Sequence, residues 1–146
     1  MNERRKLKLT TFMTMCEELA KLSYDPKYQV ATMIFTADFR EICSIGYNGE
    51  YKGGPNARTS LEPGGSGFLH AEENSIISLA KSFELRGQLV LMCTHKPCTM
   101  CAKRIVNAGI TQVIFKNHYQ DTFNQTDEIF TISGVSCHSF DVLINS

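Results

Sequence analysis

Length, composition and charge already exclude several classes of protein. The chain has 146 residues, of which 42% are hydrophobic and 21% charged, so it can bury a core and has an ordinary globular composition. Its formal net charge of +0 lacks the basic excess typical of proteins that grip a nucleic-acid backbone, which favours a small ligand. The sequence contains no apolar run of the roughly 20 residues that cross a bilayer and no export signal, so we expect no membrane contact and a cytoplasmic location.

The first half of the chain predicts a helix, a hairpin and a long loop. Apolar residues at helical spacing indicate a helix over residues 11–23. Two short runs rich in strand formers, 29–35 and 41–47, predict a β-hairpin. Residues 48–69 hold six of the ten glycines and no periodicity, and a loop this long in a compact domain is usually functional. We interpret this loop as a lid or a substrate-contacting segment.

The second half alternates helices with strands. The predicted elements are a helix over 70–82, a strand over 88–94, a helix from Pro97 to Gly109, a strand over 112–115, a helix over 126–133 and a strand over 136–144. Strands separated by helices need crossover connections, so the later strands should be parallel. We therefore expect one α/β domain over 1–146, a three-layer α/β/α sandwich with a five-stranded mixed sheet and one antiparallel edge hairpin. The order of the strands is not predicted.

Only two of the six cysteines form a close pair, Cys98 and Cys101. In a chain without an export signal, such a pair suggests a metal site more than a disulfide. The other four cysteines lie in apolar stretches, where a thiol behaves as a small buried hydrophobic group, and we interpret them as core residues: Cys16, Cys43, Cys93 and Cys137.

Two short motifs at predicted helix starts carry the chemistry. Cys98 and Cys101 are three residues apart, so they share a helical face, and a helix N-terminus favours their thiolate forms. With His70 they make a ligand set that suits zinc and leaves a fourth position open for water. Glu72, two residues past His70, is placed to act as a proton shuttle beside that water. A redox pair or a structural zinc knuckle is the alternative. His70 as a metal partner disfavours the redox pair, and the absence of an obvious fourth protein ligand in the sequence disfavours the structural site.

The two motifs, His70-Ala71-Glu72 and Pro97-Cys98-Thr99-Met100-Cys101, resemble those of the cytidine deaminase superfamily. The resemblance extends from about Leu22 to Val142 and is greatest for the dCMP deaminases. It includes three further segments, Ser23-Tyr24-Asp25-Pro26-Lys27-Tyr28-Gln29-Val30-Ala31, Gly46-Tyr47-Asn48-Gly49 and Ala102-Lys103-Arg104-Ile105-Val106-Asn107-Ala108-Gly109-Ile110.

The resemblance implies a reaction and roles for individual residues. The reaction is hydrolytic deamination of a free cytosine nucleotide, dCMP to dUMP and ammonia, with zinc held by His70, Cys98 and Cys101 and with Glu72 as proton shuttle. The implied substrate contacts are Asn48 at the sugar, Ala71, and Tyr119 near the base. Relatives in this branch imply a homo-oligomer and possible regulation by dCTP and dTTP.

Several alternatives stay open at this point. The glycine-rich loop replaces the segment that precedes the histidine in the family, and Met100 is similar to a residue in tRNA adenosine deaminases. The substrate could therefore be dCTP, cytidine, guanine or a tRNA adenosine, and a non-catalytic nucleotide-sensing zinc protein is the rival from another class. Lys52 and Arg58 are candidate phosphate contacts. We interpret the cluster Arg4, Arg5, Lys6 and Lys8 as a solvated helix start, and His118 and His138 as surface residues.

Overall fold

The computed structural model describes residues 1–60, 66–80, 88–118 and 124–146. None of the helices described there is long and apolar enough to cross a membrane. In chain order the elements are α1 (Glu3–Ala20), β1 (Ala31–Thr36), β2 (Ile42–Tyr47), α2 (Ala71–Ala80), β3 (Leu89–His95), α3 (Thr99–Asn107), β4 (Ile110–Asn117), α4 (Thr126–Ser133), β5 (Ser136–Ser139) and α5 (Phe140–Ile144).

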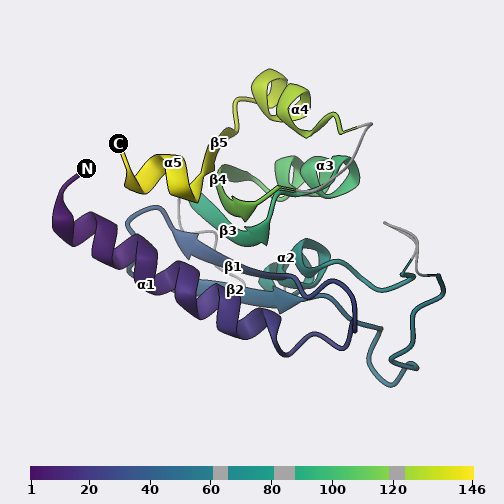
Figure 1. Cartoon of the computed structure of the whole chain (residues 1–146). Coiled ribbons are helices and arrows are strands. Elements are labelled where there is room, and N and C mark those ends of the chain that lie inside the picture. The colour runs from purple at the N-terminus through teal and green to yellow at the C-terminus, as the bar shows by residue number, and fades with distance from the viewer. Residues whose placement is uncertain (61–65, 81–87, 119–123) are drawn as a thin grey trace.

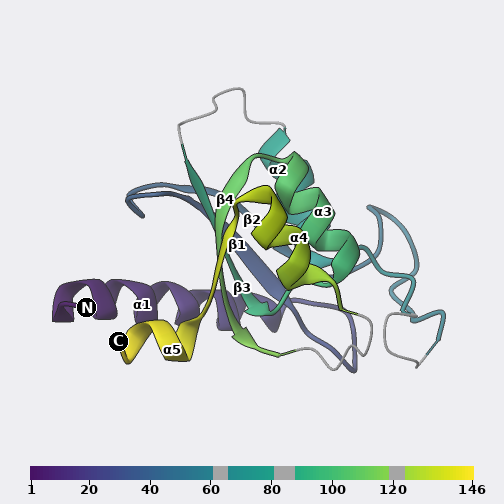
Figure 2. The same cartoon turned by 90° about the horizontal axis from the view of Figure 1, so that it is seen from above.

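The sheet has five strands in the order β2-β1-β3-β4-β5. Strand β1 pairs antiparallel with both β2 and β3, whereas β3, β4 and β5 run parallel. Helices α1 and α5 cover one face of the sheet, and α2, α3 and α4 cover the other (Figures 1 and 2). The predicted α/β fold, with its mixed sheet, parallel later strands and edge hairpin, is confirmed.

The central strands are buried because both faces of the sheet are covered. Residues 31–35 of β1 and 89–94 of β3 are buried throughout, as expected of strands that read as continuous apolar runs. One core cluster lies between the sheet and α1, and a second lies between the sheet and α2, α3 and α4. All six cysteines are described and are free thiols: Cys16 and Cys93 are buried, whereas Cys43 and Cys137 are half-buried against the second cluster.

The first helix begins eight residues earlier than the apolar spacing predicts. Its N-cap is Asn2, whose side chain accepts a hydrogen bond from the backbone N–H of Arg5 at 2.8 Å. Of the basic residues that follow, Arg4 and Arg5 are exposed and Lys6 and Lys8 are half-buried, and only Leu9 is buried in these first turns, so the apolar period is hard to see here. The cap signal, asparagine before a polar helical turn, was the available evidence for the true start.

The strand predicted over 136–144 is wrong after Ser139. Residues Ser136–Ser139 pair with β4, and the chain then turns into the short helix α5. Phe140 is 4% exposed, and Leu143 and Ile144 pack against the cluster beneath α1. A five-residue helix is too short for apolar periodicity to distinguish it from a strand.

Candidate functional site

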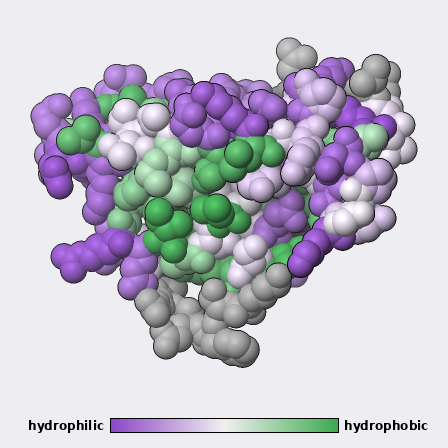
Figure 3. Space-filling model, turned by 90° about the horizontal axis from the view of Figure 1, so that it is seen from below, coloured by the Kyte–Doolittle hydropathy of each residue, from purple (hydrophilic) through white to green (hydrophobic). Residues whose placement is uncertain are grey.

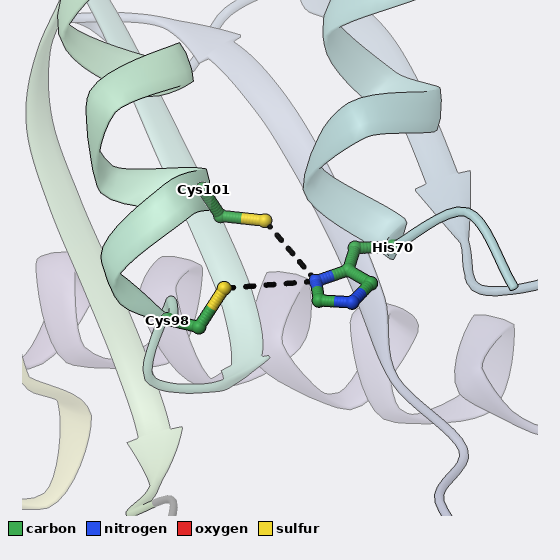
Figure 4. Close-up of side chains that lie close together, drawn as sticks. All are labelled: His70, Cys98 and Cys101. Carbon is green, nitrogen blue, oxygen red and sulfur yellow. Dashed lines mark hydrogen bonds between the residues drawn. The ribbon is translucent and has the colours of Figure 1, made fainter. Parts of the chain in front are cut away.

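The two zinc motifs meet between the first turns of neighbouring helices. His70 directly precedes α2, Cys98 is the N-cap of α3, and Cys101 lies in its first turn. Figure 4 shows the imidazole pointing from the start of α2 toward both sulfur atoms of α3. The two helices cover the same face of the sheet, which brings residues 28 positions apart into contact.

The distances between these side chains fit a zinc ion. The Nδ1 atom of His70 lies 3.7 Å from the Sγ of Cys98 and 3.3 Å from the Sγ of Cys101. In a tetrahedron with Zn–S of about 2.3 Å and Zn–N of about 2.0–2.1 Å, nitrogen and sulfur ligands lie about 3.6 Å apart. Within the described parts of the chain, the cluster of possible metal ligands consists of these three residues alone, and their ligand atoms all lie within 4.8 Å of one another. A cation held by them keeps a coordination position for another molecule.

Local interactions favour negative charge on the sulfur of Cys98, whereas the hydrogen bond with Cys98 and burial raise the pKa of the Cys101 thiol above its usual value. The pKa of the Cys98 thiol is lowered to about 4, chiefly by a hydrogen bond with Cys101 and also by the His70 ring. The hydrogen bond with Cys98 in turn raises the pKa of His70. A thiolate is the form that binds metal, so Cys98 is suited to bind a divalent cation, whereas Cys101 would lose its proton when the cation binds.

Glu72 lies in the first turn of α2, close enough to interact with His70 and Cys101, and is 5% exposed. Burial raises the pKa of its carboxyl group above the usual value, although the positive charge of His70 and a hydrogen bond with Cys101 oppose that rise. A raised pKa makes the carboxyl group of Glu72 a better proton acceptor than an ordinary exposed carboxylate. The position and burial of Glu72 are therefore those of a group able to shuttle protons.

A glycine lets the start of α2 lie directly on the sheet. A Cβ atom at Gly46 of β2 would come within 2.5 Å of both the Ala71 carbonyl oxygen and the Ser75 nitrogen. The Thr32 hydroxyl of β1 donates a hydrogen bond to the same Ala71 oxygen at 3.0 Å. These contacts fix the first turn of α2, and with it His70 and Glu72, against the two strands.

The ends of the glycine-rich loop are joined beside the site. The N–H of Gly49 donates to the carbonyl of Leu69 at 3.1 Å, and the N–H of Leu69 donates back at 2.9 Å. This bridge brings Asn48 and His70, which flank the paired residues, to the same end of the sheet. No helix or strand occurs in the described parts of this loop, 48–60 and 66–69, in agreement with the predicted loop.

The side chain of Asn48 is 7% exposed and is held by protein contacts. Its Oδ1 accepts the Val30 N–H at 2.9 Å, and its Nδ2 donates to the Tyr28 carbonyl at 2.7 Å. Ala71 is fully buried at the start of α2. Tyr119 lies outside the described residues, and the contacts of all three predicted substrate residues with a ligand stay predictions.

A buried ion pair fastens the loop to the segment before β1. Arg58 pairs with Asp25, and the two side chains are only 5% and 2% exposed. Asp25 also accepts the backbone N–H groups of Lys27 and Tyr28 at 2.8 and 3.2 Å. Burial alone would raise the pKa of Asp25, but these hydrogen bonds and Arg58 hold it below its usual value. Arg58 is thus committed to Asp25, whereas Lys52 is exposed.

The sequence motifs did not reveal the structural roles of Asp25 and Glu73. Asp25 accepts hydrogen bonds from the backbone N–H groups two and three residues later, and an aspartate followed by such a segment is a sequence signal for a turn. Glu73 lies three residues after His70, the spacing at which a glutamate reaches back to the residue that caps a helix.

Known proteins resemble this chain along most of its length. Deoxycytidylate deaminase of Homo sapiens is 31% identical over 140 residues, which cover 88% of this chain and 77% of the relative. ComE operon protein 2 of Bacillus subtilis is 30% identical over 135 residues, which cover 90% of this chain and 70% of the relative.

A solved structure shares the fold. The crystal structure of dCMP deaminase from the cyanophage S-TIM5 in complex with dCMP and dUMP has a TM-score of 0.79 and 27% identity, and the match covers 95% of this chain and 98% of that one. The sequence pattern described as the cytidine and deoxycytidylate deaminase zinc-binding region matches residues 7–117. With its histidine and two cysteines gathered at one point, the chain belongs to the cytidine and deoxycytidylate deaminase family.

Proposed function

We propose that this protein is a deoxycytidylate deaminase, a zinc-dependent hydrolase that converts dCMP and water to dUMP and ammonia. The observation that carries the proposal is the convergence of His70, Cys98 and Cys101 beside the buried carboxyl group of Glu72. The substrate is supported by the deoxycytidylate deaminase of Homo sapiens and by the cyanophage enzyme in complex with dCMP and dUMP.

In this proposal the chain supplies a metal-binding triad and a proton shuttle. His70, Cys98 and Cys101 hold zinc, which when bound lowers the pKa of water toward neutrality and so supplies a nucleophile. Glu72 takes a proton from the water that adds to C4 of cytosine. It gives that proton to N3, then takes the proton of the new C4 hydroxyl group and passes it to the amine, so that the C4–N bond breaks, ammonia leaves and the uracil ring remains.

Three residues are proposed to contact the substrate. Asn48 is proposed at the sugar, and the Gly49–Leu69 bridge supports this role because it brings Asn48, next to Gly49, near His70, next to Leu69. Ala71, between a ligand and the shuttle, is proposed to contact the substrate through the first turn of α2. Tyr119 is proposed near the base on the family resemblance alone.

A panel of nucleotides tests the substrate. We expect the purified zinc-loaded protein to release ammonia from dCMP, with kcat/KM at least tenfold higher than for dCTP, cytidine, guanine or a tRNA anticodon stem with an unpaired adenosine. If the protein releases ammonia from one of those other substrates in preference to dCMP, the chain belongs to a different branch of the family. Bound zinc without ammonia from any substrate would favour a nucleotide-sensing protein. Adding dCTP or dTTP to the dCMP assay tests the predicted regulation.

Replacing one proposed ligand should remove the metal. We expect the wild-type protein to carry one zinc ion per chain and Cys101→Ala to carry almost none, because two ligands bind zinc far more weakly than three. The measurement is zinc per chain by atomic emission after dialysis. Cys137→Ala is the matched control, since this half-buried cysteine lies against the second core cluster, and it should keep its zinc. A Cys101→Ala protein with full zinc would contradict the ligand assignment.

We also propose that the protein forms a homo-oligomer in the cytoplasm. Apolar side chains gather on the side of the molecule where β2 forms the edge of the sheet (Figure 3). Ile42 and Ile45 of β2 and Ile77 of α2 are 46%, 43% and 49% exposed. A sheet edge with exposed apolar groups is suited to association with a second copy. Light scattering should show an assembly that Ile45→Lys weakens; a monomer for the wild type would contradict the proposal.

A further inference from the structure

One carboxylate touches both helices that carry the proposed zinc ligands. Oε1 of Glu73, in α2, accepts a hydrogen bond from the backbone N–H of His70 at 3.0 Å. Its second oxygen, Oε2, lies 3.4 Å from Nε of Arg104 in α3. The Glu73 side chain is 19% exposed and that of Arg104 is 40% exposed, so the ion pair is partly shielded from water.

Both partners are one helical turn from a proposed ligand. Glu73 follows His70 by three residues, and Arg104 follows Cys101 by three residues, so each lies on the same helical face as that ligand. The spacing between α2 and α3 determines how close the imidazole comes to the two sulfurs. An interaction that ties the backbone of His70 to α3 therefore acts on the same distance that sets the geometry of the metal site.

We propose that Glu73 and Arg104 form a clasp, the Glu73–Arg104 clasp, that positions His70 against Cys98 and Cys101 and slows the loss of zinc. Glu73 is a positioning residue: it contacts the backbone of one ligand and the side chain of a neighbouring helix. The clasp rests on the proposed zinc site, but nothing in it depends on which nucleotide is deaminated. An ordinary exposed ion pair would affect stability slightly and leave zinc release unchanged.

The test is the rate at which zinc leaves the holoprotein for an excess of a chromogenic chelator. We expect Glu73→Ala to accelerate release about tenfold, the lower end of the effect seen when interactions behind metal ligands are removed. Glu73→Gln keeps an oxygen for the His70 N–H but loses the charge, so its release should be intermediate. Arg104→Ala should resemble Glu73→Gln, and Arg104→Lys should recover part of the wild-type rate.

Two comparisons separate the clasp from a general loss of stability. The double variant Glu73→Ala with Arg104→Ala should release zinc no faster than Glu73→Ala alone, because both changes remove one interaction. Glu18→Ala is the matched control: it breaks an exposed helical pair with Lys21, at 2.8 Å in α1, and should release zinc at the wild-type rate. Circular dichroism verifies that each variant is folded.

The outcomes distinguish the clasp from the function on which it rests. A wild-type protein without stoichiometric zinc would contradict the proposed function itself. A wild-type protein that holds zinc, together with Glu73→Ala and Glu73→Gln variants that release it within twofold of the wild-type rate, would contradict the clasp alone. Additive effects of Glu73→Ala and Arg104→Ala would also contradict it, since the two residues would then act independently.

Discussion

Replacing Glu72 with glutamine is expected to abolish the deamination of dCMP while zinc stays bound. The amide matches the carboxylate in shape but cannot carry a proton from water to N3 or to the departing amine. General acid–base groups contribute about 10²–10⁴-fold to rate, so kcat should fall by at least that factor. Ammonia release and zinc per chain, measured on the same preparation, test both halves of the expectation.

The control for this variant is the same chemical change at an exposed glutamate. Glu128 lies in the first turn of α4 and is exposed, so Glu128→Gln should deaminate dCMP at the wild-type rate. If Glu72→Gln keeps wild-type turnover, the proton shuttle is another group. If Glu72→Gln loses its zinc, its inactivity does not test proton transfer, because the amide then fails to replace the carboxylate without disturbing the metal site.

Removing the charge of Arg58 is expected to destabilise the protein by about 3–5 kcal/mol, the usual cost of removing one partner of a buried ion pair and leaving the other charge unpaired. Arg58→Ala leaves the Asp25 carboxylate buried at 2% exposure, with only its hydrogen bonds from the backbone and from Asn48. Asp25→Asn keeps the acceptor for the Lys27 and Tyr28 N–H groups, so it isolates the loss of charge. Urea unfolding monitored by circular dichroism gives the change in free energy.

Lys52 offers a control within the same loop. Its side chain is exposed, so Lys52→Ala should change the free energy of unfolding by no more than about 0.5 kcal/mol. The combination of Asp25→Asn with Arg58→Ala should cost less than the sum of the single changes, because the second change relieves an unpaired buried charge. If the losses in the free energy of unfolding are strictly additive, the two side chains do not form the ion pair that the structure shows.

The short-range patterns predicted which three residues gather at the candidate metal site. Spacing alone put Cys98 and Cys101 on one helical face, and the order of elements put both helix starts at one end of the sheet. The fold class followed because the apolar runs of β1 and β3 are those of strands covered on both faces.

The parts that could not be predicted depend on contacts between distant residues. The pairing of Arg58 with Asp25 spans 33 positions and crosses an aperiodic loop, where no spacing rule identifies a partner. The strand order depends on how the crossover helices pack, which apolar periodicity does not specify. By contrast, Asn2 before α1 and Glu73 three residues after His70 are local signals of helix capping that the sequence does contain.

The bridge between Gly49 and Leu69 lets the loop that it closes change in length without moving the residues on either side. Because the two ends of the loop are hydrogen-bonded to each other, an insertion between them does not alter the spacing of the residues outside it. Doubling the length of a flexible loop costs only about 0.6 kcal/mol in closure entropy. An insertion that keeps Arg58 and its partner Asp25 is therefore expected to leave Asn48 and His70 in place.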